Sequence, residues 1–441
     1  MKKMLFLMAA VMLTLTACHK QDEEILVKVS VQLTQFGEPF TETVPVILAS
    51  AAASYTQETD ENGKAQFEVP FGAYTASVSF KKGNTNYNGT TQVVVEMQEP
   101  DPETGETPAL PVVVALTASN TSALIIKEIY NGGCKQNNGT SNYINDRYLI
   151  IYNNSDQEVD ASRMCITMAQ ISNTTAANKY TIDENGVLEY ELAGWTPANF
   201  GIWWFQSGVE VKLAPYSQIS VAITGAIDHT VTYSNSVDLS GVDFCMYDPE
   251  SGFNGKAQYP APADGIPTSH YMKTYEFGQG TAWAIGLNNA APFLIIPDEG
   301  VDITEWVKTE ANFDQRGTNK STNYAKVPTS WILDAMEEWS AADPSKYFCR
   351  FPASVSTGYN IMNSGFGYSQ YRNVDKNATE AIAENAGKLV YNYAGAVSEE
   401  DTDPSGIDAE ASIANGAKIV YLDTNNSAND FHQRKVASLK K

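Results

Sequence analysis

The sequence predicts an all-β protein built from two consecutive β-sandwich domains, the second enlarged by long loops and one or two short helices. Short runs in which every second residue is apolar recur along the chain, as half-buried strands require. Gly, Pro and Asn residues separate these runs at turn positions. The 441 residues are also too many for one ordinary sandwich, so more than one domain is expected.

Residues 1–17 are predicted to be a signal peptide, which is removed before the protein folds. Lys2 and Lys3 precede an apolar run that ends at Ala17, shorter than the roughly 20 residues of a membrane-spanning helix. The tetrapeptide Leu-Thr-Ala-Cys that ends at Cys18 resembles the bacterial lipobox. This resemblance implies that the Cys18 thiol carries lipid and that acyl chains hold the protein to a membrane.

Residues 18–24 are expected to form an acidic tether. The cluster Asp22-Glu23-Glu24 resembles the export signal that sends Bacteroides-type lipoproteins to the cell surface. It implies a lipid-anchored protein of the outer membrane that is exposed at the surface. No later apolar run reaches membrane-spanning length.

The first domain is predicted to span residues 25–118. Residues 25–33 alternate as a strand, and 44–48 form a second one. Asn62-Gly63 predicts a tight hairpin turn before a further alternating run. The Pro- and Glu-rich segment 96–111 predicts a long surface loop, because it cannot bury apolar area or complete a hydrogen-bond ladder.

The turn region of this domain, Thr-Asp-Glu-Asn-Gly-Lys-Ala-Gln-Phe at residues 59–67 followed by Val-Pro-Phe-Gly-Ala-Tyr at 69–74, carries a family resemblance. It resembles the carboxypeptidase regulatory-like, transthyretin-type β-sandwich module. The resemblance implies a spacer or docking unit without catalytic function. A generic immunoglobulin-like sandwich is the alternative.

The second domain is predicted to span residues 119–441, after a short hinge at 118–121. Its opening strands at 123–131 and 146–153, with the Asn-Asn-Ser-Asp turn that follows, resemble lamin-tail-like immunoglobulin sandwiches. Residues 211–223 predict a strand, a turn and another strand.

Two later segments complete this domain. Residues 326–339 predict a short helix, because Trp331, Ala335 and Trp339 would share one stripe. Residues 418–431 predict a strand that enters an Asx-rich turn. Together the segments of the mature chain resemble a family of Bacteroides-type surface lipoproteins of unknown function.

The charge of the chain limits its partners. With 29 Lys and Arg against 52 Asp and Glu, the formal net charge is −23. A nucleic-acid backbone and an anionic membrane face would be repelled, so no nucleic-acid partner is expected. Cations, glycans and neutral or basic protein surfaces remain open.

Metal ions and other cofactors are not predicted. Four cysteines follow the lipidated one, Cys134, Cys165, Cys245 and Cys349, without a Cys-x-x-Cys pair that would suggest zinc or redox chemistry. Two disulfides and four buried free thiols are both open. Oxygen-bearing side chains at 423–430 could suit calcium, but an Asx turn is the favoured interpretation.

Catalysis is not predicted either. The only histidines are His19, His229, His270 and His432, and His19 lies beside the anchor. Asp228 and His229 would point to opposite faces of a strand, and no nucleophile-elbow or zinc-protease motif is present. The protein is therefore expected to be a binding protein without enzymatic activity.

The aromatic run from Trp195 to Phe205 is the strongest candidate for partner contact. An exposed surface bearing Trp195 with Trp203 or Trp204 could stack on sugar rings or anchor a protein interface. If residues 203–205 form a strand, Trp204 faces one way and its neighbours the other, and core packing is the favoured role.

Two functions follow as hypotheses. The first is an accessory lipoprotein that docks on an outer-membrane transporter or barrel protein. The second is a glycan-binding lipoprotein that uses the aromatic run as its stacking surface, which requires these tryptophans to be exposed.

Overall fold

The computed structural model describes residues 26–440, with gaps at 36–37, 51–52, 83–84, 103, 121, 170–179, 183–186, 192, 279, 284 and 340–346. The predicted signal peptide, Cys18 and the acidic tether lie outside the described residues. The chain divides into two compact units, the first running to Ser77 and including Thr90–Val114, the second comprising Val78–Gly89 and Ala115–Lys441. Most described residues in regular structure lie in strands and only four short α-helices occur among them, which confirms the all-β prediction.

The first unit is built on alternating strands. Strand β1 (Val27–Gln35) pairs antiparallel with β5 (Lys64–Val69) and with the short β2 (Glu38–Pro39), and β8 (Leu110–Ala115) pairs with β1. A second sheet has the order β4-β3-β6-β7-β9. Its strands are β3 (Pro45–Ala49), β4 (Ser54–Glu58), β6 (Gly72–Lys82), β7 (Thr85–Val95) and β9 (Thr117–Asn120). Every second side chain of β1 and β5 is buried, as the sequence predicts.

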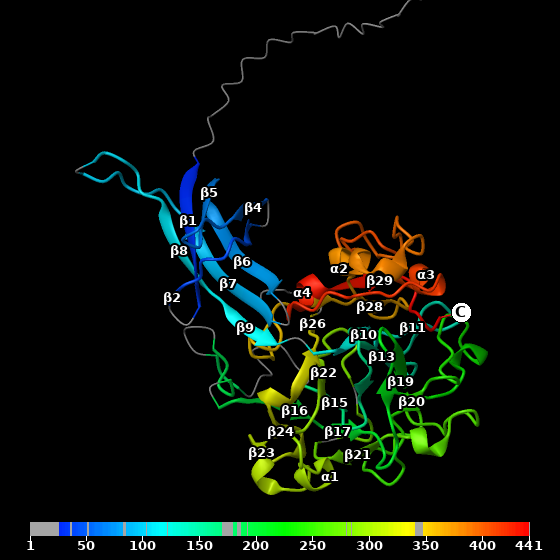
Figure 1. The fold of residues 1–441 in the computed structure, drawn as a ribbon. Helices are drawn as coiled ribbons and strands as arrows, with labels where there is room; N and C mark the ends of the chain where they lie inside the picture. The colour runs from blue at the N-terminus through cyan, green and yellow to red at the C-terminus, as the bar shows by residue number, and fades with distance from the viewer. Residues whose placement is uncertain are drawn as a thin grey trace, which may run out of the picture. The chain divides into compact units, whose positions relative to one another are not determined.

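Two segments near the end of the first predicted domain, the surface loop and the hinge, can be compared with the structure. The predicted surface loop is confirmed for its described residues up to 109, where no strand occurs, whereas Leu110 and Pro111 begin β8. This loop extends beyond the sheets in Figure 1. The segment 118–121, predicted to be a hinge, is regular in its described part, and it lies in the second unit. Residues 117–120 form β9, which pairs with β7 from Thr85↔Asn120 to Asn88↔Thr117 and so continues the sheet.

Two large sheets face each other in the second unit. The six-stranded sheet has the order β20-β19-β13-β10-β28-β29, and the five-stranded sheet has the order β21-β17-β15-β22-β25. The strands of the first are β10 (Leu124–Tyr130), β13 (Tyr148–Asn153), β19 (Gln218–Ala222), β20 (Phe244–Cys245), β28 (Ser369–Arg372) and β29 (Phe431–Arg434). Those of the second are β15 (Cys165–Met168), β17 (Gly201–Trp204), β21 (Lys273–Glu276), β22 (Pro292–Ile295) and β25 (Ile332–Ala335).

The main core lies between these two sheets, and side chains alternate between the two faces of a sheet along strands such as β13 and β22. Leu149 and Ile151 of β13 meet Ile166 of β15 and Leu294 of β22 in one cluster. The intervening residues of the five-stranded sheet, such as Phe293, enter a second cluster on its other face. Because the inner strand β22 is buried on both faces, its residues Pro292–Ile295 are continuously apolar, whereas the edge strand β21 carries polar side chains.

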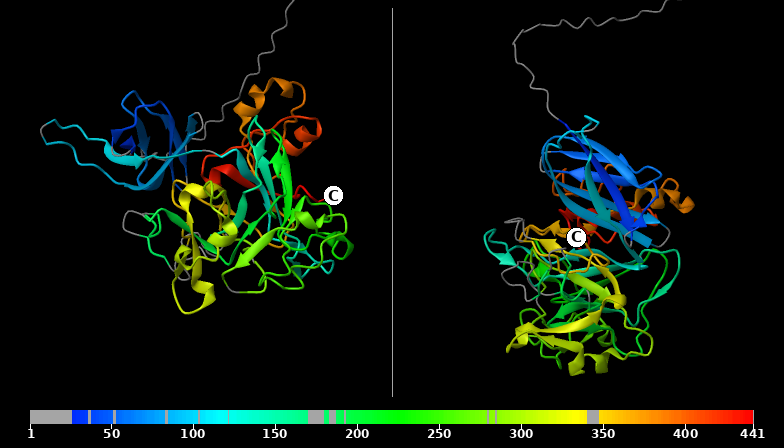
Figure 2. Two further views of the ribbon diagram at one scale, coloured as in Figure 1. Left: turned by 60° about the horizontal axis from the view of Figure 1, so that its bottom comes forward. Right: turned by 90° about the vertical axis from the view of Figure 1, so that its left-hand side faces the viewer.

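A third layer covers the outer face of the five-stranded sheet. It contains a three-stranded sheet of β16 (Trp195–Asn199), β24 (Asn323–Pro328) and β23 (Phe313–Gln315), and the one-turn helix α1 (Ile303–Trp306). The helices α2 (Lys376–Ala381) and α3 (Ala409–Ala414) lie together elsewhere in this unit, shown in orange in Figures 1 and 2. The remaining helix, α4 (Ser427–Asp430), precedes β29.

The helix predicted over 326–339 is wrong. Residues 326–328 end β24, Thr329–Trp331 form a single 3-10 turn, and Ile332–Ala335 form β25. The four-residue spacing of Trp331 and Ala335 suits a helix, but both side chains reach the same cluster from a turn and a strand. Pairing of β25 with β22 supplies the backbone hydrogen bonds and overrides the local pattern.

The strand predicted at the start of 418–431 does not form a ladder. Only an isolated bridge joins Tyr421 to Val374. The Asx-rich turn is present, since the Asn426 side chain accepts from the Ala428 amide and begins α4. Within the described part of the chain, no helix is long and apolar enough to cross a membrane.

Candidate functional site

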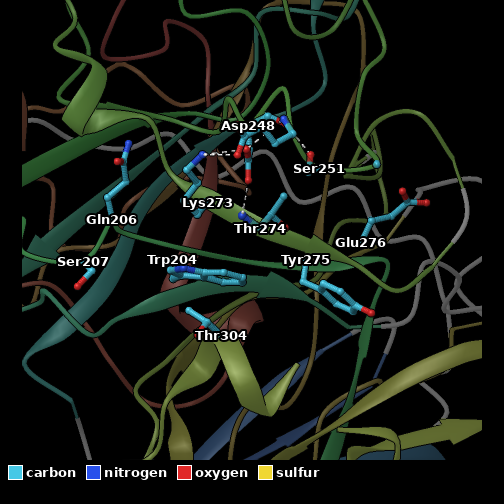
Figure 3. A pocket seen from close by; sticks show the side chains of 12 residues that line it. Trp204, Gln206, Ser207, Asp248, Ser251, Lys273, Thr274, Tyr275, Glu276 and Thr304 are labelled. Atoms are coloured by element: carbon cyan, nitrogen blue, oxygen red, sulfur yellow. Dashed lines mark hydrogen bonds and ion pairs between the residues drawn. The ribbon is translucent and has the colours of Figure 1, made fainter. Parts of the chain in front are cut away.

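A hollow of about 650 Å³ opens at the edge of the five-stranded sheet (Figure 3). Strand β17 ends beside it at Trp204, and the edge strand β21 supplies Lys273, Tyr275 and Glu276. The turn at 248–252 and helix α1 complete the wall. Its lining includes Trp204, Gln206, Ser207, Asp248, Glu250, Ser251, Gly252, Lys273, Thr274, Tyr275, Glu276 and Thr304.

Strand register places two aromatic rings on the same side of this hollow. Trp204 lies opposite Lys273, and Ile202 lies opposite Tyr275. Residues opposite each other in an antiparallel pair share a face, so Trp204 and Tyr275 are diagonal neighbours roughly 7–8 Å apart by Cα. Trp204 is half-buried against the outer core and Tyr275 is 38% exposed, so both rings reach the hollow.

Asp248 fixes the polar side of the hollow. One carboxylate oxygen lies 3.1 Å from Lys273 Nζ and accepts from the Glu250 amide at 3.3 Å. The other accepts from the Thr274 amide at 3.2 Å. Asp248 is only 6% exposed, so it holds the 248–252 turn and the Lys273 ammonium in place against β21.

Other polar groups of the hollow remain available to a ligand. Among the residues that the structure describes, no side-chain hydrogen bond occupies the Tyr275 hydroxyl or the Glu276 carboxylate. Glu250 is 88% exposed at the rim. Gly252 gives Glu276 its position, because a Cβ at residue 252 would lie 1.2 Å from a Glu276 carboxylate oxygen.

The aromatic surface of Trp195 and Trp203 that the glycan hypothesis required does not form, and for Trp203 the favoured interpretation, core packing, is confirmed. Trp203 is fully buried and stacks on Phe253, with ring centroids 5.9 Å apart. Trp195 is half-buried in a separate cluster with Tyr180 and Tyr190. Successive strand residues face opposite ways, so when Trp203 enters the main core, Trp204 must face the outer layer. Trp204 is thus the one of the three that lines the hollow.

Sequence reasoning missed the partners of Trp204. Asp248, Lys273, Tyr275 and Glu276 lie 44 to 72 positions further along the chain. Asp248 begins a Pro- and Gly-containing turn, which is a detectable signal. Nothing local to the sequence shows that this turn and β21 meet Trp204, because the β17–β21 register is set by tertiary pairing.

The four cysteines are free thiols. Burial raises the pKa of Cys134 to about 11 and the pKa values of Cys165, Cys245 and Cys349 to about 12. Of the two alternatives that the sequence leaves open, the structure therefore has the free thiols; Cys134, Cys165 and Cys245 are buried and Cys349 is half-buried. Raised pKa values keep them protonated and poorly nucleophilic.

Two of the described histidines, His229 and His432, have both ring nitrogens in hydrogen bonds within the second unit. His229 contacts the Tyr143 hydroxyl at 2.7 Å and the Gly225 carbonyl at 2.6 Å through its two ring nitrogens. His432 is likewise held by Tyr393 and Asn373. In the same described ranges, no group of three or more His, Cys, Asp or Glu side chains is placed to hold a metal ion.

Comparisons with known proteins place the chain beside uncharacterised relatives. Residues 214–438 match the model of a family described as a protein of unknown function, DUF4876. The structure of a DUF4876 family protein from Bacteroides thetaiotaomicron VPI-5482 is 19% identical, over 94% of this chain and 97% of that one, with a TM-score of 0.52. At this identity the likeness shows a shared fold.

Other similarities are weak. A DUF3823 family protein from Parabacteroides merdae ATCC 43184 is 12% identical over 45% of this chain and 82% of that one, with a TM-score of 0.17. The Bacillus anthracis TIE protein is 10% identical over 40% and 27%, with a TM-score of 0.16. No curated protein matches the chain.

Proposed function

This chain belongs to the DUF4876 family of proteins of unknown function, and we propose that it is a non-enzymatic glycan-binding protein. The glycan would bind in the hollow beside Trp204, which we also call the groove, and a lipid anchor would hold the protein at the cell surface. The observation that carries this proposal is the pair of rings, Trp204 and Tyr275, placed diagonally on one sheet face beside an open polar hollow. Sugar rings present apolar C–H faces edged by hydroxyls. The C–H faces of a sugar can stack on aromatic side chains, while its hydroxyls form hydrogen bonds with polar groups around them.

The polar groups of the hollow suit sugar hydroxyls. A hydroxyl both donates and accepts, so it can donate to the Glu276 carboxylate and accept from the Lys273 ammonium. Asp248 fixes Lys273 beforehand, which reduces the ordering cost of binding. The hollow therefore has apolar and polar contacts arranged as a sugar requires.

Binding without cleavage is supported by the surroundings of two of the three carboxylates that line the hollow, Asp248 and Glu250. A glycosidase needs one carboxylic acid whose pKa is raised by an apolar setting and a second, ionised one. Asp248 is fixed by Lys273 and two backbone amides, and Glu250 is open to solvent. Neither environment suits a general acid.

The N-terminal features give the proposed location. The lipobox-like residues before Cys18 and the acidic cluster at 22–24 support a lipid-anchored, surface-exposed protein of the outer membrane. We interpret the first unit as a carboxypeptidase regulatory-like spacer and the second as a lamin-tail-like sandwich that carries the groove. Docking on a transporter or barrel protein stays a prediction. The hollow favours glycan binding over docking, but with Trp204 and Tyr275 as the stacking surface in place of the aromatic run expected from the sequence.

A glycan array tests the proposal. The full mature chain is applied to immobilised neutral oligosaccharides of glucose, xylose, mannose and galactose. We expect selective binding that weakens about tenfold in Tyr275→Ala, because a stacking ring is lost. Tyr275 is the better target than Trp204, because Trp204 also packs against the outer core and its removal would cost stability.

The matched control is Tyr391→Ala, which removes an exposed tyrosine outside the groove. Tyr391 is 46% exposed. The control should bind as the unaltered protein does. Absence of binding to every glycan, or equal binding by Tyr275→Ala and the unaltered protein, would refute the proposal.

A further inference from the structure

The hollow beside Trp204 and Tyr275 has a neighbour on each side. A hollow of about 190 Å³ is lined by Ser162, Arg163, Pro297 and Asp302, together with Trp204 and Thr304. Another of about 580 Å³ is lined by Phe277, Lys308, Phe313 and Lys320, together with Tyr275 and Glu276. We call these the small and the lysine-lined hollow, and the one described above the central hollow.

The shared walls give the order of the three hollows. Trp204, Ser207 and Thr304 line both the central and the small hollow. Tyr275 and Glu276 line both the central and the lysine-lined hollow. In Figure 3, Ser207 lies to the left of Trp204, while Tyr275 and Glu276 lie to its right. The central hollow therefore lies between the other two, with one aromatic ring at each junction.

From this order we infer that the ligand is an uncharged oligosaccharide of several units that runs through all three hollows. The inference rests on the proposed glycan-binding function. A hollow of roughly 300–1,000 Å³ is enough for one small molecule. A single sugar in the central hollow would thus leave the small and the lysine-lined hollow empty. An oligosaccharide that passes Trp204 and then Tyr275 would occupy all three hollows.

The charges along the groove favour a neutral chain. The central hollow has Asp248, Glu250 and Glu276 against Lys273 alone. In the lysine-lined hollow, Lys308 and Lys320 are balanced by Glu276 and Glu310. Uronate or sulfate groups would meet excess negative charge at the centre, where like charges repel. Neutral hydroxyl-rich units meet no such penalty.

Chain length is the variable that tests this inference. Binding of the full mature chain is measured by calorimetry with glucose-, xylose- and mannose-based oligosaccharides of one to six units. We expect the hexasaccharide of the preferred sugar to bind at least about tenfold more tightly than the monosaccharide, because it contacts all three hollows. Sulfated chains of the same length should bind more weakly.

A blocking variant locates the additional units. Lys320 is exposed on the wall of the lysine-lined hollow, and Lys320→Trp should fill that space and abolish most of the gain with length. Lys376→Trp changes an exposed lysine of α2 outside the groove and should keep the gain. The blocked protein should remain folded by circular dichroism.

The outcomes separate this inference from the proposed function. Binding that depends on Tyr275 but is equal for one and six units would overturn the inference and leave the glycan-binding function standing. Tighter binding of sulfated chains, or an undiminished gain in Lys320→Trp, would also overturn it. Absence of binding at every length would overturn both.

Discussion

His432 shows how one buried side chain sets a response to pH. Its ring nitrogens contact the Tyr393 hydroxyl and the Asn373 side chain, each at 2.7 Å. Burial, with the nearby Arg434 charge, lowers the pKa of His432 to about 3. In the unfolded chain this imidazole titrates near its ordinary pKa of about 6.5. The unfolded state therefore binds more protons between these two values.

The sign of the effect follows from this difference. His432 contributes stability that is fully present above about pH 6.5 and is lost as the pH falls toward 3, by up to about 1.4 kcal/mol per pH unit. We expect His432→Gln to reduce the loss of unfolding free energy between about pH 7 and pH 5, measured by urea titration. An unchanged slope would show that the pKa of His432 is the same in the folded and unfolded states.

The carboxylates of Asp423 and Asp430, which the sequence offered as possible calcium ligands, are buried. Arg372 is fully buried, and its guanidinium lies 3.6 Å from both Asp423 and Asp430 and forms an ion pair with Asp334. Asp430 also accepts from the Thr424 amide. A guanidinium and backbone amides therefore occupy the oxygens that could have suited calcium. Arg372 lies about 50 positions earlier, so local sequence does not reveal it.

At the scale of the element, the Asn62-Gly63 turn combines two separate constraints. Gly63 has a φ of +73°, and a Cβ there would lie 1.9 Å from the Phe40 carbonyl oxygen. Gly105, in the long hairpin loop, has a φ of +71° but open space around it. The two glycines therefore share the left-handed conformation and differ in the close backbone approach.

Alanine at each position separates these constraints. Gly105→Ala should cost about 1 kcal/mol of unfolding free energy in the first unit, from the left-handed conformation alone. Gly63→Ala should cost several times more, because the Phe40 backbone must also move. Denaturant unfolding of the full chain measures both. Equal losses would mean that the turn relaxes without strain.

For the whole molecule, membrane attachment is the property to test. Cys18→Ala removes the proposed lipidation site, and the protein should then move from the membrane to the soluble fraction, because acyl chains supply the anchor. Fractionation followed by immunoblotting measures this shift. If the variant stays with the membrane, the anchor lies elsewhere.

The same preparation examines the docking hypothesis. Lipidated protein is affinity-purified from detergent-solubilised outer membranes, with Cys18→Ala as the control. Co-purified proteins are identified by mass spectrometry. A stoichiometric transporter or barrel protein would support docking in addition to glycan binding. Recovery of the lipoprotein alone would remove stable docking from consideration.

The sequence by itself determined the features that depend on neighbouring residues. Alternation along 25–33 and the Asn62-Gly63 pair predicted a strand and a tight turn, and the structure confirms both. The turn does not form a hairpin, because it joins β4 to β5 and these strands lie in different sheets. Strand alternation also predicted that Trp204 faces the opposite side of the sheet from Trp203 and Phe205, because successive side chains of any strand point to opposite faces. Charge, turn chemistry and strand period are local, so they can be read without knowing which segments meet.

The tertiary structure alone decided which segments meet and hence where the groove lies. Pairing with β22 turned 332–335 from an expected helix into a strand. Pairing of β17 with β21 buried Trp203 and placed Tyr275 beside Trp204, about 70 positions away in sequence. The physical reason is that sheet register depends on complementary burial and hydrogen bonding between distant segments. No local periodicity encodes that choice of partner.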